Sequence, residues 1–274
     1  MRVLAINDIS CVGKCSLSVS LPILSACGIT CDVLPTALLS THTGGFDGYT
    51  FRDLTGDIPA ILAHWKTLGL QFDCIYSGYL GSIAQIQLVE SIKNEFLADG
   101  GLFIVDPVMG DSGNLYTGFT DAFVEKMREL CRQADYILPN VTEACYLTQT
   151  PYPADGETYP TQTVLTRLQA LCKRPIVTGI HQGADVLVSY LDENGVMQSR
   201  SDENVPGFFC GAGDVFASAF IGALLHGKCE HDAIELAASF TTASIRRSAT
   251  EVPDKRYGLN FEAEIFTFLK NLHA

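Results

Sequence analysis

A glycine-rich turn that carries one acid stands in the last quarter of the chain. Residues 211–214 read Gly-Ala-Gly-Asp, and a run of small and apolar residues follows directly. Glycines at a helix start let backbone N–H groups converge on an anion, and the helix dipole also favours negative charge there. The turn is predicted to bind a transferring phosphoryl group, with Asp214 placed to accept a proton from an attacking hydroxyl. The amides belong to Gly211, Ala212 and Gly213. The structural alternative is a plain turn in which Asp214 only caps the helix.

Two acids five residues apart follow an expected strand in the middle of the chain. They are Asp106 and Asp111, in the segment Asp-Pro-Val-Met-Gly-Asp. Ligands of open α/β sheets bind at the carboxyl ends of strands, where acids commonly hold Mg²⁺ against phosphates. The pattern therefore favours a magnesium site, with a turn of solvated acids as the alternative.

A third strand end, at residues 138–143, reads Leu-Pro-Asn-Val-Thr-Glu and turns into an expected helix. Asn140 is able to donate to a phosphate, and Glu143 stands one helical turn further on, where it could act through metal-bound water. The same two residues fit a capping box, in which Asn140 caps the helix and Glu143 closes the box. Both interpretations stay open.

Two familiar nucleotide motifs are excluded. Gly13 and Lys14 look like the end of a Walker loop, but Cys15 replaces the required Ser or Thr and Asp8 stands at the first glycine position. The turn at 211–214 fails as a dinucleotide fingerprint because Phe216 occupies the third glycine position.

Short β-rich runs alternate with helical stretches through most of the chain. This pattern predicts a three-layer α/β/α fold around a mainly parallel sheet, in a single domain over residues 1–274. Expected strands are 3–6, 30–35, 74–77, 102–105, 136–138, 176–178 and a hairpin pair, 186–190 and 196–200, with its turn at 192–195. Expected helices are 16–27, 56–68, 82–96, 121–131, 161–172, 213–225 and 231–247, before a last short helix.

Composition limits the class of protein. Of the 274 residues 47% are apolar and 18% charged, with no apolar run of transmembrane length and no leader-like start. The net charge of −13 opposes a nucleic-acid backbone, although a divalent metal can neutralise ATP phosphates inside a small pocket. The 10 cysteines form no C-x-x-C pair and no zinc-type cluster. We expect a cytoplasmic protein with reduced thiols and with no nucleic-acid or membrane partner.

The three motifs, in the order DPVMGD, PNVTE and GAGD, resemble the ribokinase-like superfamily. Four further segments make the chain similar to its vitamin B6 kinases, which act on pyridoxal, pyridoxine and pyridoxamine. These segments are Ala-Ile-Asn-Asp (5–8), Ser-Thr-His-Thr-Gly (40–44), Ser-Gly-Tyr-Leu-Gly-Ser (77–82) and Asn-Leu-Tyr (114–116). The similarity covers residues 2–250 and implies a ribokinase-like kinase domain with no separate lid domain.

The resemblance implies ATP-dependent phosphorylation of the 5-hydroxymethyl group of a B6 vitamer, with Asp214 as the base. It assigns Mg²⁺ to Asp106 and Glu143, directly or through water, with Asp111 beside them. Asn140 and Thr178 would contact ATP phosphates, and the loop 205–210 would lie near adenine. The loop residues named for this role are Val205 and Phe209. A monovalent cation such as K⁺ and a two-fold homodimer are common in the superfamily and are expected here by analogy.

For the vitamer, Asp8, Thr43 and Tyr79 fall where these kinases contact the pyridine ring, and Tyr116 belongs to a flap over the site. His42 is left open between a ligand contact and a structural role. Many relatives have Ser at the position of Asp8, so ring recognition is expected to differ in this chain.

Two alternative functions stay open. One is a hydroxymethylpyrimidine kinase of the same superfamily, and the other is a non-catalytic relative that binds a vitamer. Some relatives hold the aldehyde of pyridoxal on a flap cysteine, but residues 110–119 contain none. We therefore expect pyridoxal to bind as the free aldehyde, with Cys11, Cys15 and Cys210 as the other thiols near the site.

Overall fold

The computed structural model describes residues 1–154 and 157–274, and its contacts divide the chain into two compact units. Unit 1 joins Met1–Phe72 to Val205–Ala274, and unit 2 holds Asp73–Asn204. The single-domain organisation over residues 1–274 stays a prediction. No helix among the described residues is both long enough and apolar enough to cross a bilayer.

Unit 1 is built on two long parallel strands. In it β1 (Arg2–Val12) pairs in parallel with β2 (Thr30–Thr41), and β3 (Phe51–Asp53) adds antiparallel to β2. Residues 3–8 of β1 are all buried, as expected for a parallel strand that is covered on both faces. The register shifts between Asn7 and Ile9, so a bulge lies where the polar part of the strand begins.

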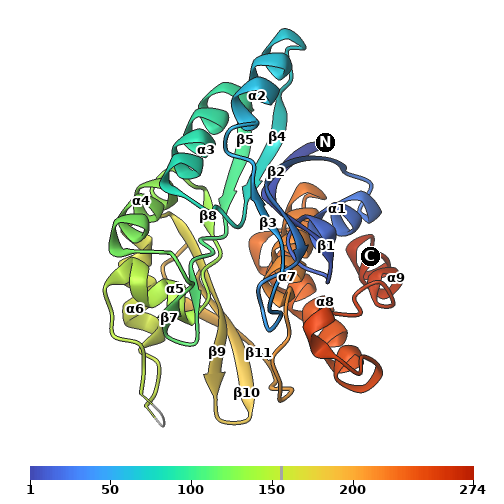
Figure 1. The fold of residues 1–274 in the computed structure, drawn as a ribbon. Coiled ribbons are helices and arrows are strands. Elements are labelled where there is room, and N and C mark those ends of the chain that lie inside the picture. The colour runs from blue at the N-terminus through green and yellow to red at the C-terminus, as the bar shows by residue number, and fades with distance from the viewer. Residues whose placement is uncertain (155–156) are drawn as a thin grey trace. The chain divides into compact units, whose positions relative to one another are not determined.

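Helices from both ends of the chain cover these strands, and Figure 1 shows the blue α1 beside the orange and red C-terminal helices. They are α1 (Leu17–Ala26), α2 (Ile58–Thr67), α7 (Ala212–Leu225), α8 (Glu230–Glu251), the 3₁₀ turn Lys255–Tyr257 and α9 (Ile265–Leu272). Helix α7 is buried almost throughout because its residues are small or apolar. A Cβ on its Gly222 would lie 2.8 Å from the Cys27 sulfur, so glycine permits close packing on α1.

Unit 2 holds six strands in the order β11-β10-β9-β8-β5-β4. The pairs β5–β8 and β8–β9 are parallel, whereas β9–β10 and β10–β11 are antiparallel. The bounds are β4 (Phe72–Ser77), β5 (Leu97–Val105), β8 (Tyr136–Ile137), β9 (Arg174–Gln182), β10 (Asp185–Leu191) and β11 (Met197–Glu203). The predicted hairpin is confirmed as β10–β11, and its turn is closed by Asp192, which accepts from the amides of Asn194 and Val196.

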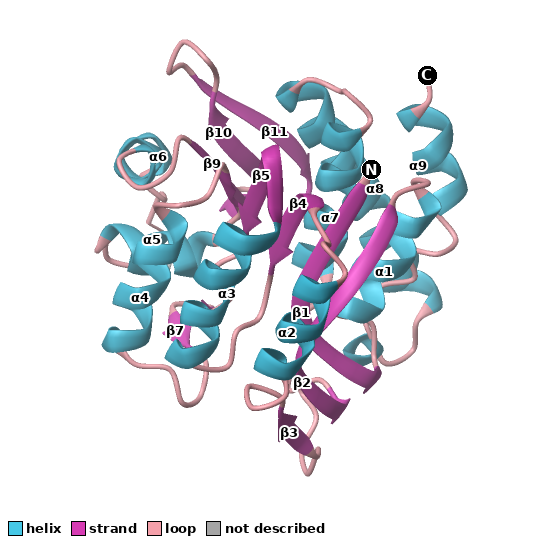
Figure 2. Cartoon of the chain, turned by 90° about the horizontal axis from the view of Figure 1, so that it is seen from above, coloured by secondary structure: helices cyan, strands magenta, loops and turns pink. Residues whose placement is uncertain are grey.

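The helices of unit 2 gather beside its strands in Figure 2. They are α3 (Ile83–Phe96), α4 (Asp121–Cys131), α5 (Val141–Thr148) and α6 (Thr161–Gln169). A small hairpin, β6 (Gly110–Asp111) with β7 (Asn114–Leu115), lies between β5 and α4 in the sequence and was not predicted. Gly110 is required there because a Cβ would lie 2.4 Å from the Asn114 carbonyl oxygen.

Candidate active site

The glycine-rich turn lies at the start of α7, as the sequence predicts. Gly211 is the N-cap residue, with a φ of 79°, and a Cβ on it would lie 2.3 Å from the carbonyl oxygen of Lys14. Only glycine fits this close approach. Ala212 and Gly213 follow as the first helical residues, and Asp214 lies in the first turn. No side chain caps this helix, so the alternative in which Asp214 serves as its cap is wrong.

The Asp214 carboxylate is held by two donors within unit 1. The backbone N–H of Ser16 donates to Oδ2 at 2.8 Å, and Asn7 Nδ2 donates to Oδ1 at 3.3 Å. Burial raises the pKa of Asp214 to about 7, and the nearby charge of Asp8 adds to this rise while the two donors oppose it. A carboxylate with a pKa near neutrality suits general base catalysis.

Asp8 lies at the end of the buried part of β1 and is only 6% exposed. Ser16 Oγ donates to its Oδ1 at 2.5 Å, and Ser10 Oγ donates to its Oδ2 at 3.5 Å. Burial raises the pKa of Asp8, and the Ser16 hydroxyl opposes the shift. Both oxygens of Asp8 thus have partners inside the protein, and contact with a pyridine ring stays a prediction.

His42 is fixed by backbone groups on both sides of its ring. The amide of Gly44 donates to Nδ1 at 3.1 Å, so Nε2 carries the proton that it shares with the Arg256 carbonyl oxygen at 2.6 Å. The ring is 7% exposed and packs edge-on against Phe46 at 5.1 Å. These contacts favour the structural interpretation of His42, while its neighbour Thr43 is exposed.

The loop proposed to lie near adenine connects β11 to α7. Val205 and Phe209 are half-buried, and Lys255 Nζ lies 5.2 Å from the centre of the Phe209 ring. Phe208 is 60% exposed and borders a hollow lined with residues 253–256. An exposed aromatic ring beside cationic side chains can stack on a flat base, and binding of adenine here stays a prediction.

In unit 2, Asp106 follows β5 and is 8% exposed. Its amide donates to the Ser77 carbonyl oxygen at 2.8 Å, and its own carbonyl accepts from Val108 at 2.8 Å. The loop that follows leads into the β6–β7 hairpin. Asp111 is half-buried there, and its Oδ1 accepts from the Ser112 amide at 2.7 Å.

The capping box at the start of α5 is formed. Asn140 Oδ1 accepts from the Glu143 amide at 2.9 Å, and Glu143 Oε2 accepts from the Asn140 amide at 2.9 Å. The same side chains also tie down the loop after β5, since Asn140 Nδ2 donates to the Gly110 carbonyl at 2.9 Å and the Met109 amide donates to Glu143 Oε1 at 3.2 Å. Burial raises the pKa of Glu143 to about 8, against the effect of these amides.

Thr178 lies next to Asn140, as the shared phosphate role requires. Its amide donates to the Pro139 carbonyl oxygen at 3.0 Å, and residues 140 and 178 form a parallel bridge. The two predicted phosphate residues therefore come from neighbouring strand ends. Their contact with ATP stays a prediction.

The residues present fit a magnesium ion that is also bound by phosphates. Among residues 1–154 and 157–274 no group of three or more His, Cys, Asp or Glu side chains is placed to hold a metal. Mg²⁺ commonly needs only one or two carboxylates beside substrate phosphates and water. Asp106 suits direct coordination, whereas Glu143, with both oxygens bound to amides, suits contact through water.

Two predicted vitamer residues lie in unit 2. The Tyr79 ring lies 5.9 Å from Phe119, which in turn stacks on Phe123 at 4.0 Å. Tyr116 is 42% exposed, and its amide donates to the Met109 carbonyl oxygen at 2.9 Å. The flap residue is therefore anchored by its backbone, while its ring is accessible.

Sequence reasoning did not identify the residues that hold the acids of unit 1. Asn7 appeared only within a family motif, and Ser16 appeared only as an expected helix start. A cluster of polar residues within an otherwise apolar strand, at 7, 8 and 10, was the available clue. All three side chains are buried.

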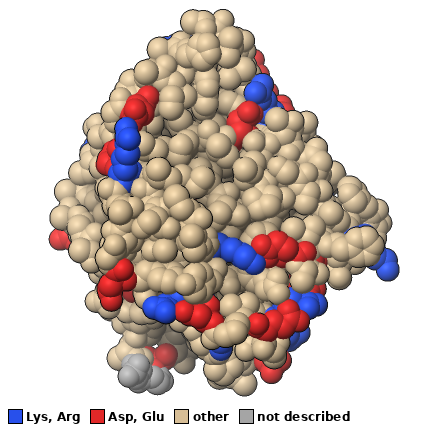
Figure 3. All heavy atoms as spheres, turned by 45° about the vertical axis from the view of Figure 1, so that its right-hand side comes forward, with Lys and Arg blue, Asp and Glu red and all other residues tan. Residues whose placement is uncertain are grey.

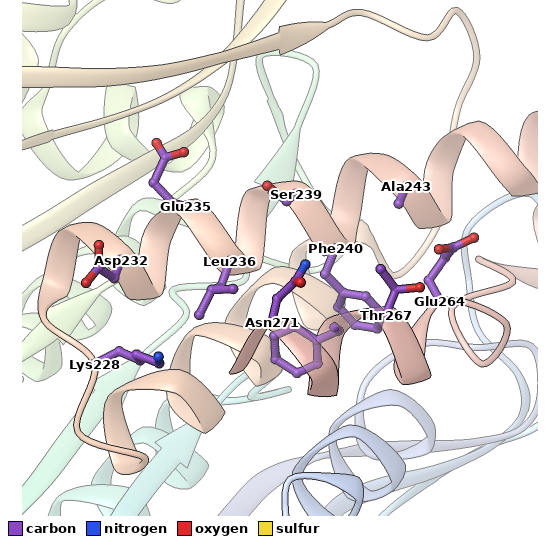
Figure 4. A pocket seen from close by; sticks show the side chains of 11 residues that line it. Lys228, Asp232, Glu235, Leu236, Ser239, Phe240, Ala243, Glu264, Thr267 and Asn271 are labelled. Carbon is purple, nitrogen blue, oxygen red and sulfur yellow. The ribbon is translucent and has the colours of Figure 1, made fainter. Parts of the chain in front are cut away.

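A hollow on unit 1 lies away from these groups in the sequence. Figure 4 shows it between α8 and α9, with Phe240 and Leu236 on one side and Asn271 and Thr267 on the other. None of the predicted site residues lines it. On the face drawn in Figure 3, basic and acidic side chains occur in small mixed groups without a continuous basic stripe.

The comparisons with known proteins agree with the motifs. A sequence model described as phosphomethylpyrimidine kinase matches residues 55–259. The crystal structure of a pyridoxal kinase from Lactobacillus plantarum is 35% identical, with a TM-score of 0.91, and covers 98% of this chain and 96% of its own. A putative phosphomethylpyrimidine kinase from Bacteroides thetaiotaomicron, in an orthorhombic form with pyridoxal, is 36% identical, with a TM-score of 0.90 and coverage of 100% and 96%. A pyridoxal kinase, PdxY, from Rubrobacter xylanophilus is 26% identical over 276 residues, or 92% of this chain and 90% of the relative.

These likenesses and the motifs at the strand ends define an α/β kinase fold of the ribokinase-like class, as the sequence predicts. The chain belongs to the family of pyridoxal and phosphomethylpyrimidine kinases.

Proposed function

We propose that the protein transfers the γ-phosphoryl group of ATP to the 5-hydroxymethyl group of pyridoxal, pyridoxine or pyridoxamine, which supplies pyridoxal 5-phosphate by salvage. The observation that carries the proposal is the carboxylate of Asp214, held at the N-terminus of α7 by Ser16 and Asn7 with a pKa near neutrality. The similarity to a pyridoxal kinase and to a relative crystallised with pyridoxal supports the vitamer as substrate.

In the proposed reaction the substrate hydroxyl oxygen forms a bond to the γ-phosphorus, and the bond from that phosphorus to the bridging oxygen of ADP breaks. Asp214 takes the hydroxyl proton, and the amides of residues 211–213 stabilise charge on the transferring group. A bound Mg²⁺ would neutralise charge on the phosphates, and Asp106 is the residue proposed to hold it. Asn140 and Thr178 are proposed to orient the phosphates, with Glu143 acting through water.

Contacts with the vitamer are proposed for Thr43, Tyr79 and Tyr116, and contacts with adenine for the loop 205–210. The exposure of Thr43 and of the Tyr116 ring supports these roles. A cytoplasmic location, a homodimer and use of K⁺ remain predictions from the resemblance.

A phosphomethylpyrimidine or hydroxymethylpyrimidine kinase is the second candidate, and the description of the matching family model favours it. Both substrates are flat nitrogen heterocycles with a primary alcohol, so the ATP groups do not separate them. Specificity is the ratio of kcat/KM values for the competing substrates.

The test is to measure kcat/KM of the purified protein with each B6 vitamer and with hydroxymethylpyrimidine and its phosphate. We expect the highest value with a B6 vitamer. A ratio that favours a pyrimidine would replace the proposed substrate by the second candidate. No phosphorylation of either class, together with binding of a vitamer, would identify a non-catalytic relative.

A further inference from the structure

Ser16 connects two acids that lie far apart in the sequence. Its backbone N–H donates to Asp214 Oδ2 at 2.8 Å, and its hydroxyl donates to Asp8 Oδ1 at 2.5 Å. The side chain is 8% exposed, so both bonds are shielded from water. One residue therefore sets the position of one carboxylate while it binds the other.

Asn7 makes a second connection between the same two acids. Its Oδ1 accepts from the amide of Asp8 at 3.0 Å, which directs Nδ2 toward Asp214 Oδ1 at 3.3 Å. Asn7 is 1% exposed and stands where the register of β1 against β2 shifts. Bulges of this kind commonly re-aim side chains next to active sites.

The backbone of Ser16 takes an unusual conformation to make these bonds. Its φ is 53° and its ψ is −129°, just before α1 begins at Leu17. Non-glycine residues seldom adopt positive φ, and those that do are concentrated at functional sites. The hydroxyl bond to Asp8 and the amide bond to Asp214 account for the retention of serine at this point.

We propose that Asp8 and Ser16 are positioning residues for the base: Ser16 holds the Asp214 carboxylate in its orientation for proton transfer, and the negative charge of Asp8 strengthens it as a base. The proposal rests on the proposed function of Asp214. It gives Asp8 a role toward the base, in place of a contact with the substrate ring.

Electrostatics in unit 1 agree with this geometry. The charge of Asp8 raises the pKa of Asp214, after the larger effect of burial. Two other titratable groups lie close: Cys15, whose thiol pKa burial raises far above its ordinary value, and His42, which acts on Asp8. The N-terminus of α7 adds a positive dipole end at Asp214 that favours the ionised carboxylate. Asp8 is therefore the acid in unit 1 that opposes this dipole.

The proposal is tested with Asp8→Asn, Ser16→Gly and Ser16→Ala, each compared with Ser244→Ala. Ser244 is a buried serine whose hydroxyl donates to a helix carbonyl at 2.8 Å and contacts no acid, so it controls for the loss of a buried hydroxyl. Glycine accepts a positive φ without strain, so Ser16→Gly removes only the hydroxyl. Agreement between the glycine and alanine variants assigns the effect to that hydroxyl.

Two measurements are made on each variant. The first is the pH dependence of kcat/KM for the vitamer, and the second is titration of the Asp214 carboxyl carbon by NMR in the protein without substrate. Removing the charge of Asp8 lowers the pKa of Asp214, so we expect Asp8→Asn to move the acid limb and the NMR titration down by about one pH unit. Ser16→Gly should shift both in the same direction by less, because Asp8 then protonates more readily. Vitamer KM should change little.

A raised vitamer KM in Asp8→Asn, with an unmoved acid limb and an unmoved titration, would overturn the proposal and assign Asp8 to ring recognition. Absence of a shift in Ser16→Gly would overturn the role of Ser16, and this variant serves if Asp8→Asn does not fold. Failure of the proposed function is distinct: the parent protein would phosphorylate no vitamer, while the NMR titration would still report whether Asp8 acts on Asp214.

Discussion

Each unit of the molecule carries an acid in the first turn of a helix, and the two acids are used differently. Glu143 closes a capping box on α5, is 3% exposed, and binds a backbone amide with each oxygen. Asp214 lies in the first turn of α7, whose cap is Gly211, and is partly exposed, with one backbone and one side-chain donor. Burial raises the pKa of both.

The comparison shows that a raised pKa does not by itself identify a catalytic acid or base. Both acids have it for the same reason, namely loss of water around the carboxylate. What differs is the use of their oxygens and their access to a reactant. A glycine cap leaves the acid of α7 outside the capping hydrogen bonds, whereas an asparagine cap engages the acid of α5.

The largest expected effect separates the two acids by function. Asp214→Asn should lower turnover by on the order of 10² to 10⁴, the usual range for loss of a general base, with ATP binding nearly intact. Steady-state kinetics and nucleotide titration measure these two properties. A variant that keeps more than half of the parent turnover would remove Asp214 from the role of base.

Asp106→Ala should act through the metal. We expect the Mg²⁺ concentration for half-maximal rate to rise about tenfold or more, because loss of a carboxylate weakens the site while the phosphates remain. The rate is measured over a magnesium series, with Asp111→Ala as the companion variant. An unchanged Mg²⁺ dependence would give Asp106 a structural role.

Glu143→Ala should mainly reduce stability. It leaves the amides of Asn140 and Met109 without their acceptors, and we expect a loss of about 2 kcal/mol in the free energy of unfolding. Urea unfolding provides the measurement. Full stability combined with a loss of activity would move Glu143 from the scaffold to the reaction.

The raised pKa values also predict a pH dependence of stability. An acid that holds its proton more tightly in the folded state stabilises the fold fully at pH values below its ordinary pKa, and this contribution is lost as the pH rises toward the folded value. For Glu143 the loss extends from about pH 4.5 to about pH 8. Glu143→Gln should therefore flatten the unfolding free energy over that window, and an unchanged slope would contradict the shift.

The smallest expected effect concerns the thiols. Residues 110–119 contain no cysteine, and burial raises the pKa of Cys15, which makes it a poor nucleophile. Bound pyridoxal should keep its aldehyde absorbance band in the parent and in Cys11→Ser, Cys15→Ser and Cys210→Ser. Loss of the band in the parent, restored by one of these replacements, would reveal a thiol adduct.

Much of the fold could be predicted from the sequence because the elements have strong patterns. Helix α4 has the predicted bounds, and the β10–β11 hairpin follows its turn residues. The sequence predicted β1 only as residues 3–6, because polar residues follow, although the strand continues to Val12. Strand β3 was missed since its three residues are all exposed.

The candidate site was predictable at the motif level and not at the level of partners. Asp214 and its glycines stand at the helix start that the motif implies. The bonds from Ser16 and Asn7 to Asp214 join residues 198 and 207 positions apart, and they depend on the bulge in β1 and the turn before α1. Neither of these features has a local sequence pattern.

The most direct test of the account is the pH dependence of kcat/KM for a B6 vitamer, compared between the parent protein and Asp214→Asn. We predict an acid limb near pH 7 in the parent, because Asp214 must be ionised to take the hydroxyl proton, and its absence from the residual activity of the variant. An acid limb that persists unchanged in Asp214→Asn would show that another group is the base and would contradict the central claim.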